Sequence, residues 1–197
     1  PCQYERLKPF VEGLARATED GRYGYLDAAG QWRIAPQYAQ ATDFQGGVAA
    51  TALTESWGLI DTTGRWVVPP AYQQLFPGND SLWIAQRDDR YGVIRPDGTV
   101  AIPFTYAEIH PFAEGLAPYR QQDLWGYLQA DGRPATPASF GLAWPFHEGL
   151  ARVVTYDGLS YINRWTGNLS YTSFFGAGDR NLVNDRDLLR LRISYNF

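Results

Sequence analysis

Apolar and aromatic residues recur along this chain in short runs that are separated by glycine turns. The clearest run is Tyr91-Gly92-Val93-Ile94, which leads into the turn Pro96-Asp97-Gly98. The glycine after the aromatic residue returns at a constant interval, at Gly24, Gly58, Gly92 and Gly126. This interval of about 34 residues lies within the range of roughly 20 to 50 residues that indicates an array of one repeated supersecondary unit.

The pattern within one period predicts three β-strands. In the first copy these are residues 14–18, 23–27 and 32–35, separated by turns at residues 19–22 and 27–30. The second turn begins with Asp27, which can cap the backbone, and ends with Gly30, which can adopt positive φ. Pro36 is expected to end the third strand, because proline cannot donate a hydrogen bond to a β-ladder.

A helical repeat is the main alternative, since a period of about 34 residues also suits a pair of helices. Composition argues against it, because glycine falls inside every candidate helix and proline follows each unit. Each interior glycine costs a helix about 1 kcal/mol relative to alanine. The aromatic and β-branched residues beside those glycines favour strands.

We therefore predict an all-β fold, a tandem array of five three-stranded β-meander repeats. It forms either an open solenoid or a five-bladed propeller-like ring, and a unit of this length is short for a four-stranded propeller blade. The repeat domain covers residues 1–167, with units at about 4–37, 38–71, 72–105, 106–139 and 140–167. The fifth unit is degraded, with Leu159-Ser160 in the place of the aromatic-glycine pair.

The repeated glycine is expected to permit a close approach between backbones or between a backbone and a ring. A bare Cα lets an aromatic ring or the next unit's backbone lie against the strand. Alanine at Gly58 or Gly92 is therefore predicted to destabilise the fold by about 1–3 kcal/mol through overpacking.

Residues 168–197 lie beyond the periodic region and are predicted to form capping or docking strands. In the last segment, five apolar residues alternate with polar ones and share one strand face: Leu189, Leu191, Ile193, Tyr195 and Phe197. Such a strand can close the array or add to the sheet of a partner. It also suits a membrane-associated partner.

Composition excludes several classes of function. The net charge is −4 with scattered Arg and Asp, which does not suit nucleic-acid binding. The single cysteine, Cys2, rules out an internal disulfide and a cysteine-based metal cluster. Cys2 is read as an inert thiol, although a lipid attachment point or an intermolecular bridge also fits its position.

Residue types that carry catalysis are few. Phenylalanine recurs at one position of the repeat, at Phe10, Phe44, Phe112 and Phe146. His110 and His147 lie beside two of these copies in different registers, and two histidines do not complete a zinc site. Glu12, Glu114 and Glu148 precede Gly-Leu-Ala and are expected to hold tight turns. With no phosphate loop or nucleophile elbow, we predict no enzyme, no cofactor and no metal site.

The repeats resemble the bacterial WG repeat, also called KWG. The best copy runs from Trp57-Gly58-Leu59-Ile60-Asp61 to Val67-Val68-Pro69-Pro70, and the resemblance spans Tyr4 to about Gly167. It implies a β-rich repeat protein of bacteria, often of the cell envelope, with no shared catalytic residues.

The predicted function is a non-enzymatic scaffold for protein–protein interaction, as a subunit of a homo- or hetero-oligomeric assembly of the bacterial envelope. One alternative is a glycan- or cell-wall-binding module, for which Trp83, Trp144 and Trp165 are the candidates because they lie off the main aromatic register. A second alternative is an immunity protein that neutralises a bacterial toxin. A cytoplasmic location is the alternative to the periplasm or outer membrane.

Overall fold

The structure is a computed structural model that describes residues 5–79, 81–155, 158–165, 168–174 and 190–194, with side chains described as far as Thr155. The described residues form strands, turns and bends with no helix, which confirms the all-β prediction. Within these residues, therefore, no helix has the length and hydrophobicity needed to cross a membrane. The chain divides into two compact units, Pro1–Thr105 and Tyr106–Phe197.

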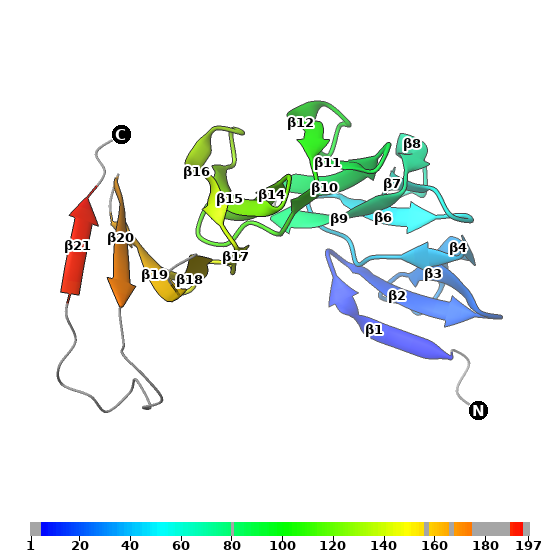
Figure 1. Cartoon of the computed structure of the whole chain (residues 1–197). Coiled ribbons are helices and arrows are strands. Elements are labelled where there is room, and N and C mark those ends of the chain that lie inside the picture. The colour runs from blue at the N-terminus through cyan, green and yellow to red at the C-terminus, as the bar shows by residue number, and fades with distance from the viewer. Residues whose placement is uncertain (1–4, 80, 156–157, 166–167, 175–189, 195–197) are drawn as a thin grey trace. The chain divides into compact units, whose positions relative to one another are not determined.

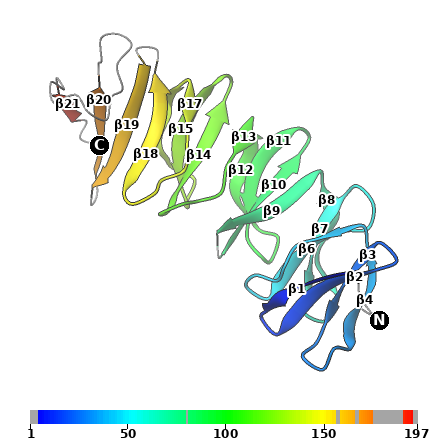
Figure 2. The same cartoon turned by 90° about the horizontal axis from the view of Figure 1, so that it is seen from below.

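The first unit contains three four-stranded antiparallel sheets (Figures 1 and 2). In the first sheet the strands are β1 (Arg6–Val11), β2 (Leu14–Glu19), β3 (Arg22–Leu26) and β4 (Trp32–Tyr38). In the second they are β5 (Gln40–Ala41), β6 (Val48–Ala52), β7 (Trp57–Asp61) and β8 (Trp66–Tyr72). In the third they are β9 (Gln74–Asn79), β10 (Leu82–Arg87), β11 (Arg90–Ile94) and β12 (Val100–Tyr106).

The second unit contains two further sheets. The fourth sheet consists of β13 (Glu108–Ile109), β14 (Leu116–Gln121), β15 (Leu124–Gln129) and β16 (Pro134–Phe140). The fifth has five strands, β17 (Leu142–Ala143), β18 (Leu150–Thr155), β19 (Gly158–Trp165), β20 (Asn168–Phe174) and β21 (Arg190–Ser194). The ladder pairs β21 with β20, so the last described strand joins its own chain.

The prediction of three strands in each unit was wrong, because a fourth strand precedes the other three. The additional strand is the segment that leads to the repeated phenylalanine, as in β5, where Gln40 pairs with Ala52 and Ala41 with Thr51. A two-residue pairing leaves no alternation in the sequence that reasoning from periodicity could detect.

Pro36 was predicted to end the third strand, but β4 continues past it to Tyr38. The register against β3 shifts between the pairs Tyr25↔Ile34 and Tyr23↔Tyr38, which marks a bulge. β4 is also the outer strand of its sheet. Proline is tolerated at edge strands and bulges, where its missing N–H breaks no ladder hydrogen bond.

The same bulge explains the repeated glycine. A Cβ at Gly58 would lie 2.5 Å from the carbonyl oxygen of Val68, and one at Gly24 would lie 2.6 Å from that of Ile34. Gly92 and Gly126 face equally close backbone oxygens. The predicted close approach is present, but the backbone concerned belongs to the last strand of the same sheet and not, as was predicted, to the next unit.

The predicted aspartate turn is also present. Asp61 accepts hydrogen bonds from the N–H groups of Thr63 (2.8 Å) and Arg65 (3.0 Å) and from the Thr63 hydroxyl (2.6 Å), and Gly64 has a φ of 84°. The Thr63 hydroxyl, followed by the two N–H groups, lowers the pKa of Asp61 below its ordinary value.

The apolar core lies between consecutive sheets. In the first unit, one buried cluster joins the first and second sheets, and another joins the second and third. In the second unit a third cluster joins the fourth and fifth sheets. Each sheet therefore buries its apolar side chains by packing against its neighbour, as repeat units do.

Candidate functional site

Contacts between sheets in both units are built from a tyrosine, a phenylalanine and a backbone carbonyl. In the first unit Tyr25 packs edge-to-face on Phe44, with ring centroids 4.7 Å apart, and its hydroxyl donates to the Thr42 carbonyl at 2.6 Å. In the second unit Tyr127 packs on Phe146 at 4.9 Å and donates to the Trp144 carbonyl at 2.7 Å. Burial raises the pKa of both tyrosines, so each hydroxyl keeps the proton that it donates.

The repeated glutamate connects neighbouring sheets. Glu12 adopts a φ of 52°, and its carboxylate accepts the N–H groups of Gly46 (2.7 Å) and Gly47 (2.9 Å), in the equivalent turn of the second sheet. Glu114 has a φ of 53° and accepts the N–H of Gly149 at 3.0 Å. The sequence predicted that these residues hold their own turn, and the structure adds the contact with the next turn.

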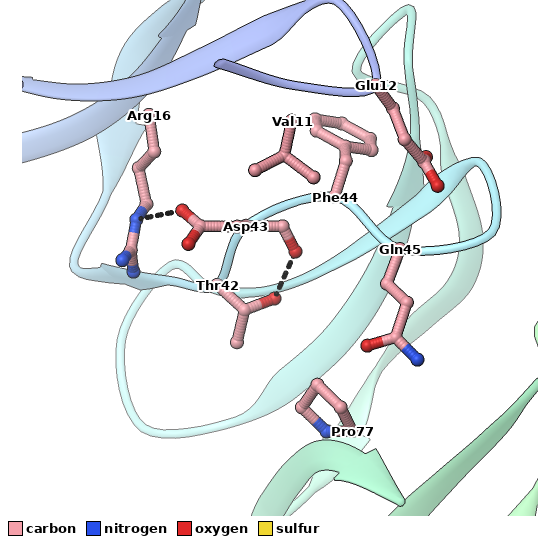
Figure 3. A pocket seen from close by; sticks show the side chains of 8 residues that line it. All are labelled: Val11, Glu12, Arg16, Thr42, Asp43, Phe44, Gln45 and Pro77. Carbon is pink, nitrogen blue, oxygen red and sulfur yellow. Dashed lines mark hydrogen bonds and ion pairs between the residues drawn. The ribbon is translucent and has the colours of Figure 1, made fainter. Parts of the chain in front are cut away.

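A groove, called groove 1 below, lies where these contacts meet in the first unit. It has a volume of about 520 Å³ and is lined by Val11, Glu12, Arg16, Thr42, Asp43, Phe44, Gln45 and Pro77. Arg16 forms an ion pair with Asp43 at 3.0 Å and also donates to the Ala41 carbonyl. In Figure 3 this ion pair and Glu12 lie on opposite sides of Val11 and Phe44.

A second groove, groove 2, lies on the fifth sheet. It has a volume of about 310 Å³ and is lined by Trp144, Pro145, His147, Leu150 and Arg152. The Arg152 guanidinium stacks over the Trp144 ring at 4.0 Å. Leu150 and Arg152 occupy the same repeat positions as Leu14 and Arg16, four periods earlier.

The outer strand β1 is exposed along its whole length, including three large apolar side chains. Leu7 is 56% exposed, Phe10 52% and Val11 36%. Phe44, at the repeat position of Phe10, is only 3% exposed because it packs into the cluster that joins the first two sheets. Leu7 pairs with Ala17 and Phe10 with Ala15, so their side chains share one side of the sheet, whereas Val11 pairs with Leu14, lies on the other side and lines groove 1. We call the apolar side chains of Leu7 and Phe10 the β1 face.

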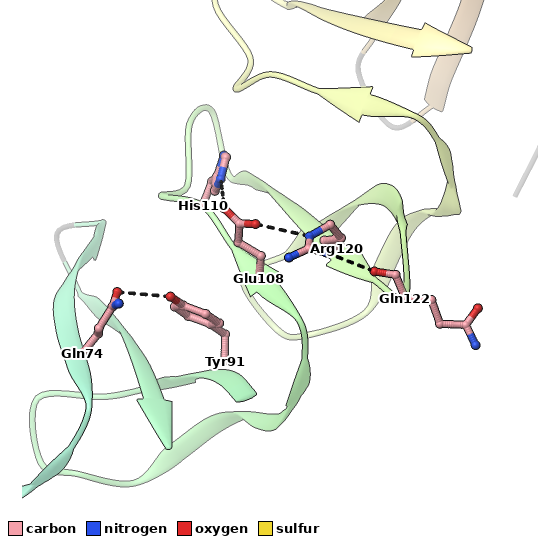
Figure 4. A network of polar contacts seen from close by, with 6 residues as sticks. All are labelled: Gln74, Tyr91, Glu108, His110, Arg120 and Gln122. Carbon is pink, nitrogen blue, oxygen red and sulfur yellow. Dashed lines mark hydrogen bonds and ion pairs between the residues drawn. The ribbon is translucent and has the colours of Figure 1, made fainter. Parts of the chain in front are cut away.

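His110 belongs to a surface network of the second unit (Figure 4). Its Nε2 lies 2.8 Å from Glu108, which also binds Arg120 at 3.3 Å, and its ring lies 4.8 Å from that of Trp125. In the part of the chain that the structure describes, no three His, Cys, Asp or Glu side chains gather as metal ligands. Figure 4 also draws a separate hydrogen bond in the first unit, in which the Tyr91 hydroxyl donates to Oε1 of Gln74 at 3.1 Å.

The residues predicted to bind a partner or a glycan have different surroundings in the structure. Trp83 was expected to be exposed, but it is 1% exposed in the cluster between the second and third sheets. Trp144 is half-buried and lines groove 2. Trp165, Leu191 and Ile193 lie on described strands without described side chains, and three residues lie outside the described residues: Leu189, Tyr195 and Phe197. Sequence reasoning missed the β1 face, although Phe10 carried the repeat signal.

A family model described as "Protein of unknown function (DUF1302)" matches residues 23–197. The chain belongs to this family. The description of the DUF1302 family names no activity or ligand. A second model, described as "WG containing repeat", matches residues 1–23, a much shorter stretch than the sequence resemblance covers. No curated protein matches the chain.

Several solved structures are similar to this chain at low identity. Hsv2 of Kluyveromyces lactis is 10% identical with a TM-score of 0.46, covering 82% of this chain and 68% of its own. The N-terminal domain of Nup159 is 8% identical with a TM-score of 0.48, covering 88% and 67%. PorZ of Porphyromonas gingivalis is 12% identical with a TM-score of 0.40, covering 88% and 30%. Such low scores support no conclusion about function.

Proposed function

We propose that this protein is a non-enzymatic scaffold that binds a protein partner through the β1 face. The observation that carries the proposal is the exposure of Leu7 and Phe10 on one side of β1. Contiguous exposed apolar side chains mark interaction surfaces in soluble proteins. At the equivalent positions of the second sheet, Ala41 and Phe44 are buried by a neighbouring sheet.

The residues around the β1 face suit a protein partner. Leu7 and Phe10 are flanked on β1 by the exposed charged side chains of Arg6 and Lys8. A mixture of apolar anchors and charged groups at the rim is typical of protein interfaces. The resemblance to WG repeats supports our proposal that this scaffold belongs to an assembly of the bacterial cell envelope.

Site-specific photo-crosslinking in cells tests this proposal. A photoreactive residue at Phe10 is expected to give a discrete protein adduct, whereas the same residue at Val100 gives none. Val100 is the matched control because it is apolar and 49% exposed but lies on β12, away from the β1 face. Equal labelling at both positions, or no protein adduct at Phe10, contradicts the proposal.

Glycan binding is the second candidate, and Trp144 is the observation in its favour. Its ring is half-buried beside groove 2, as expected for a sugar-stacking platform. However, Arg152 already covers one face of the ring at 4.0 Å, so a pyranose would need the other face. Quenching of tryptophan fluorescence by cell-wall polysaccharide, lost in Trp144→Ala, would favour this function over the scaffold.

A further inference from the structure

Four of the side chains through which the first sheet contacts the second lie on or next to β2 and β3. Glu12 binds the turn at Gly46 and Gly47, Arg16 binds Ala41 and Asp43, and Leu14 and Tyr25 surround Phe44. The fifth sheet carries the same four residue types at the same repeat positions, namely Glu148, Leu150, Arg152 and Tyr161. Tyr161 pairs with Arg152 across the ladder, as Tyr25 pairs with Arg16.

The fifth sheet therefore carries the residue types of the surface that holds the second sheet, and the side chains described there, those of Glu148, Leu150 and Arg152, are exposed. Leu150 is 45% exposed, whereas Leu14 is 8% exposed under the second sheet. Glu148 has a φ of 51°, almost the same as that of Glu12, and its side chain is exposed. Groove 2 lies on this surface of the fifth sheet. On the equivalent surface of the first sheet, the segment 41–45 of the second sheet is bound.

The β1 face is the matching half of such a contact. Phe10 stands at the repeat position of Phe44, and Gly13, with a φ of 81°, stands at that of Gly47, with a φ of 78°. Phe44 is buried against Tyr25, and the N–H of Gly47 is bound by Glu12. Phe10 is exposed and, on the same strand, Leu7 is exposed in the position of the buried Ala41.

We propose that two copies of this chain associate head to tail, with the β1 face of one copy on groove 2 of the other. Phe10 then packs beside Leu150, and Glu148 accepts the N–H groups of Glu12 and Gly13. Pro9 stands where Asp43 stands in the second sheet, so Arg152 keeps Trp144 as its partner. This inference rests on the proposed function, because it names the partner of the β1 face.

The two halves differ from each other, so the contact is heterologous. Each copy that docks leaves one β1 face and one groove 2 free, which allows further copies to add. Association is therefore expected to grow with protein concentration and to yield species larger than a dimer.

Analytical ultracentrifugation of the purified chain tests the inference through complementary variants. Phe10→Asp removes one half and Leu150→Asp removes the other, so each variant alone is expected to be monomeric. Mixed in equal amounts, they still share one intact contact and are expected to form a 1:1 dimer that does not grow further. Val100→Asp, an exposed apolar control on β12, is expected to associate like the unmodified chain.

The mixing experiment also controls for folding, because a misfolded variant could not restore the dimer. A monomeric unmodified chain, or two variants that fail to form the dimer, overturns the inference. A chain that is monomeric and loses stability on Phe10→Asp would show closure of the contact within one chain, which also overturns it. The proposed function is judged separately: an adduct at Phe10 with a different protein supports it while contradicting self-association.

Discussion

The contact between the first two sheets and the outer face of β1 involve the same repeat positions, but a neighbouring sheet covers only the former. Phe44 is 3% exposed and packs on Tyr25, whereas Phe10 is 52% exposed. The two residues are chemically identical, so the difference comes from the presence of a preceding sheet. In a repeat protein, the burial of a residue is a property of the interface between units and not of the unit alone.

Alanine substitution at the two positions is the strongest way to test this comparison. Phe44→Ala is expected to cost about 3–5 kcal/mol of unfolding free energy, since it leaves a cavity between two sheets. Phe10→Ala is expected to change the stability of dilute protein by less than about 0.5 kcal/mol, because the side chain is exposed. Urea unfolding measures both. Similar losses at the two positions would show that Phe10 is covered.

The repeated glycine offers the next largest effect. Gly58→Ala is expected to destabilise the protein by about 1–3 kcal/mol, because the new Cβ would meet the Val68 backbone in the same sheet. Gly141→Ala is the control, since a Cβ there would lie 3.6 Å from the Val154 carbonyl, at ordinary contact distance. Melting temperatures compare the two variants. An unchanged value for Gly58→Ala would contradict the close approach.

Substitutions of Glu12 and Glu148 test the same comparison, and the expected change in unfolding free energy is smaller. Glu12→Gln is expected to cost about 1 kcal/mol, because the carboxylate that accepts two N–H groups of the second sheet loses its charge. Glu148→Gln should leave the stability of dilute protein unchanged and weaken head-to-tail association instead. Unfolding and sedimentation measurements separate these outcomes. A stability loss in Glu148→Gln equal to that in Glu12→Gln would be inconsistent with an open groove 2.

The smallest expected effect is the contribution of Asp61 to acid stability. Its pKa is lowered in the folded protein, so the folded form binds a proton less readily than the unfolded chain. The stabilisation is present above the ordinary pKa of 3.8 and is lost as the pH falls through the folded value. Asp61→Asn should flatten this part of the pH dependence, as measured by urea unfolding at neutral and acidic pH. Identical pH profiles would refute it.

Several features were predictable because they depend on residues that are close in sequence. The predicted period reappears in the second strands of the sheets, which begin at Leu14, Val48, Leu82, Leu116 and Leu150. The Asp61 turn and the role of Gly58 also follow from local geometry. Turn residues and glycine act within a few positions or across one hairpin.

Other features were missed because they depend on the neighbouring sheet. The short strand β5 pairs only two residues, and the exposure of Trp83 was predicted wrongly because the third sheet packs it against the second. The carboxylate of Glu12 reaches the turn at Gly46, one full repeat further along the chain, and nothing in Glu-Gly-Leu-Ala shows this. The exposure of Phe10 could not be predicted, because Phe10 and Phe44 share one repeat position and only the structure shows that Phe44 is covered.

The sequence by itself determined where this chain turns, which residues alternate on strands and how often the unit recurs. These properties follow from φ preferences and from the two-residue periodicity of strands. The tertiary structure decided which copies of each residue are covered, since burial requires a neighbouring sheet at contact distance. For that reason identical residues such as Leu14 and Leu150 have different surroundings, and the uncovered copies mark the surfaces through which we expect this protein to bind.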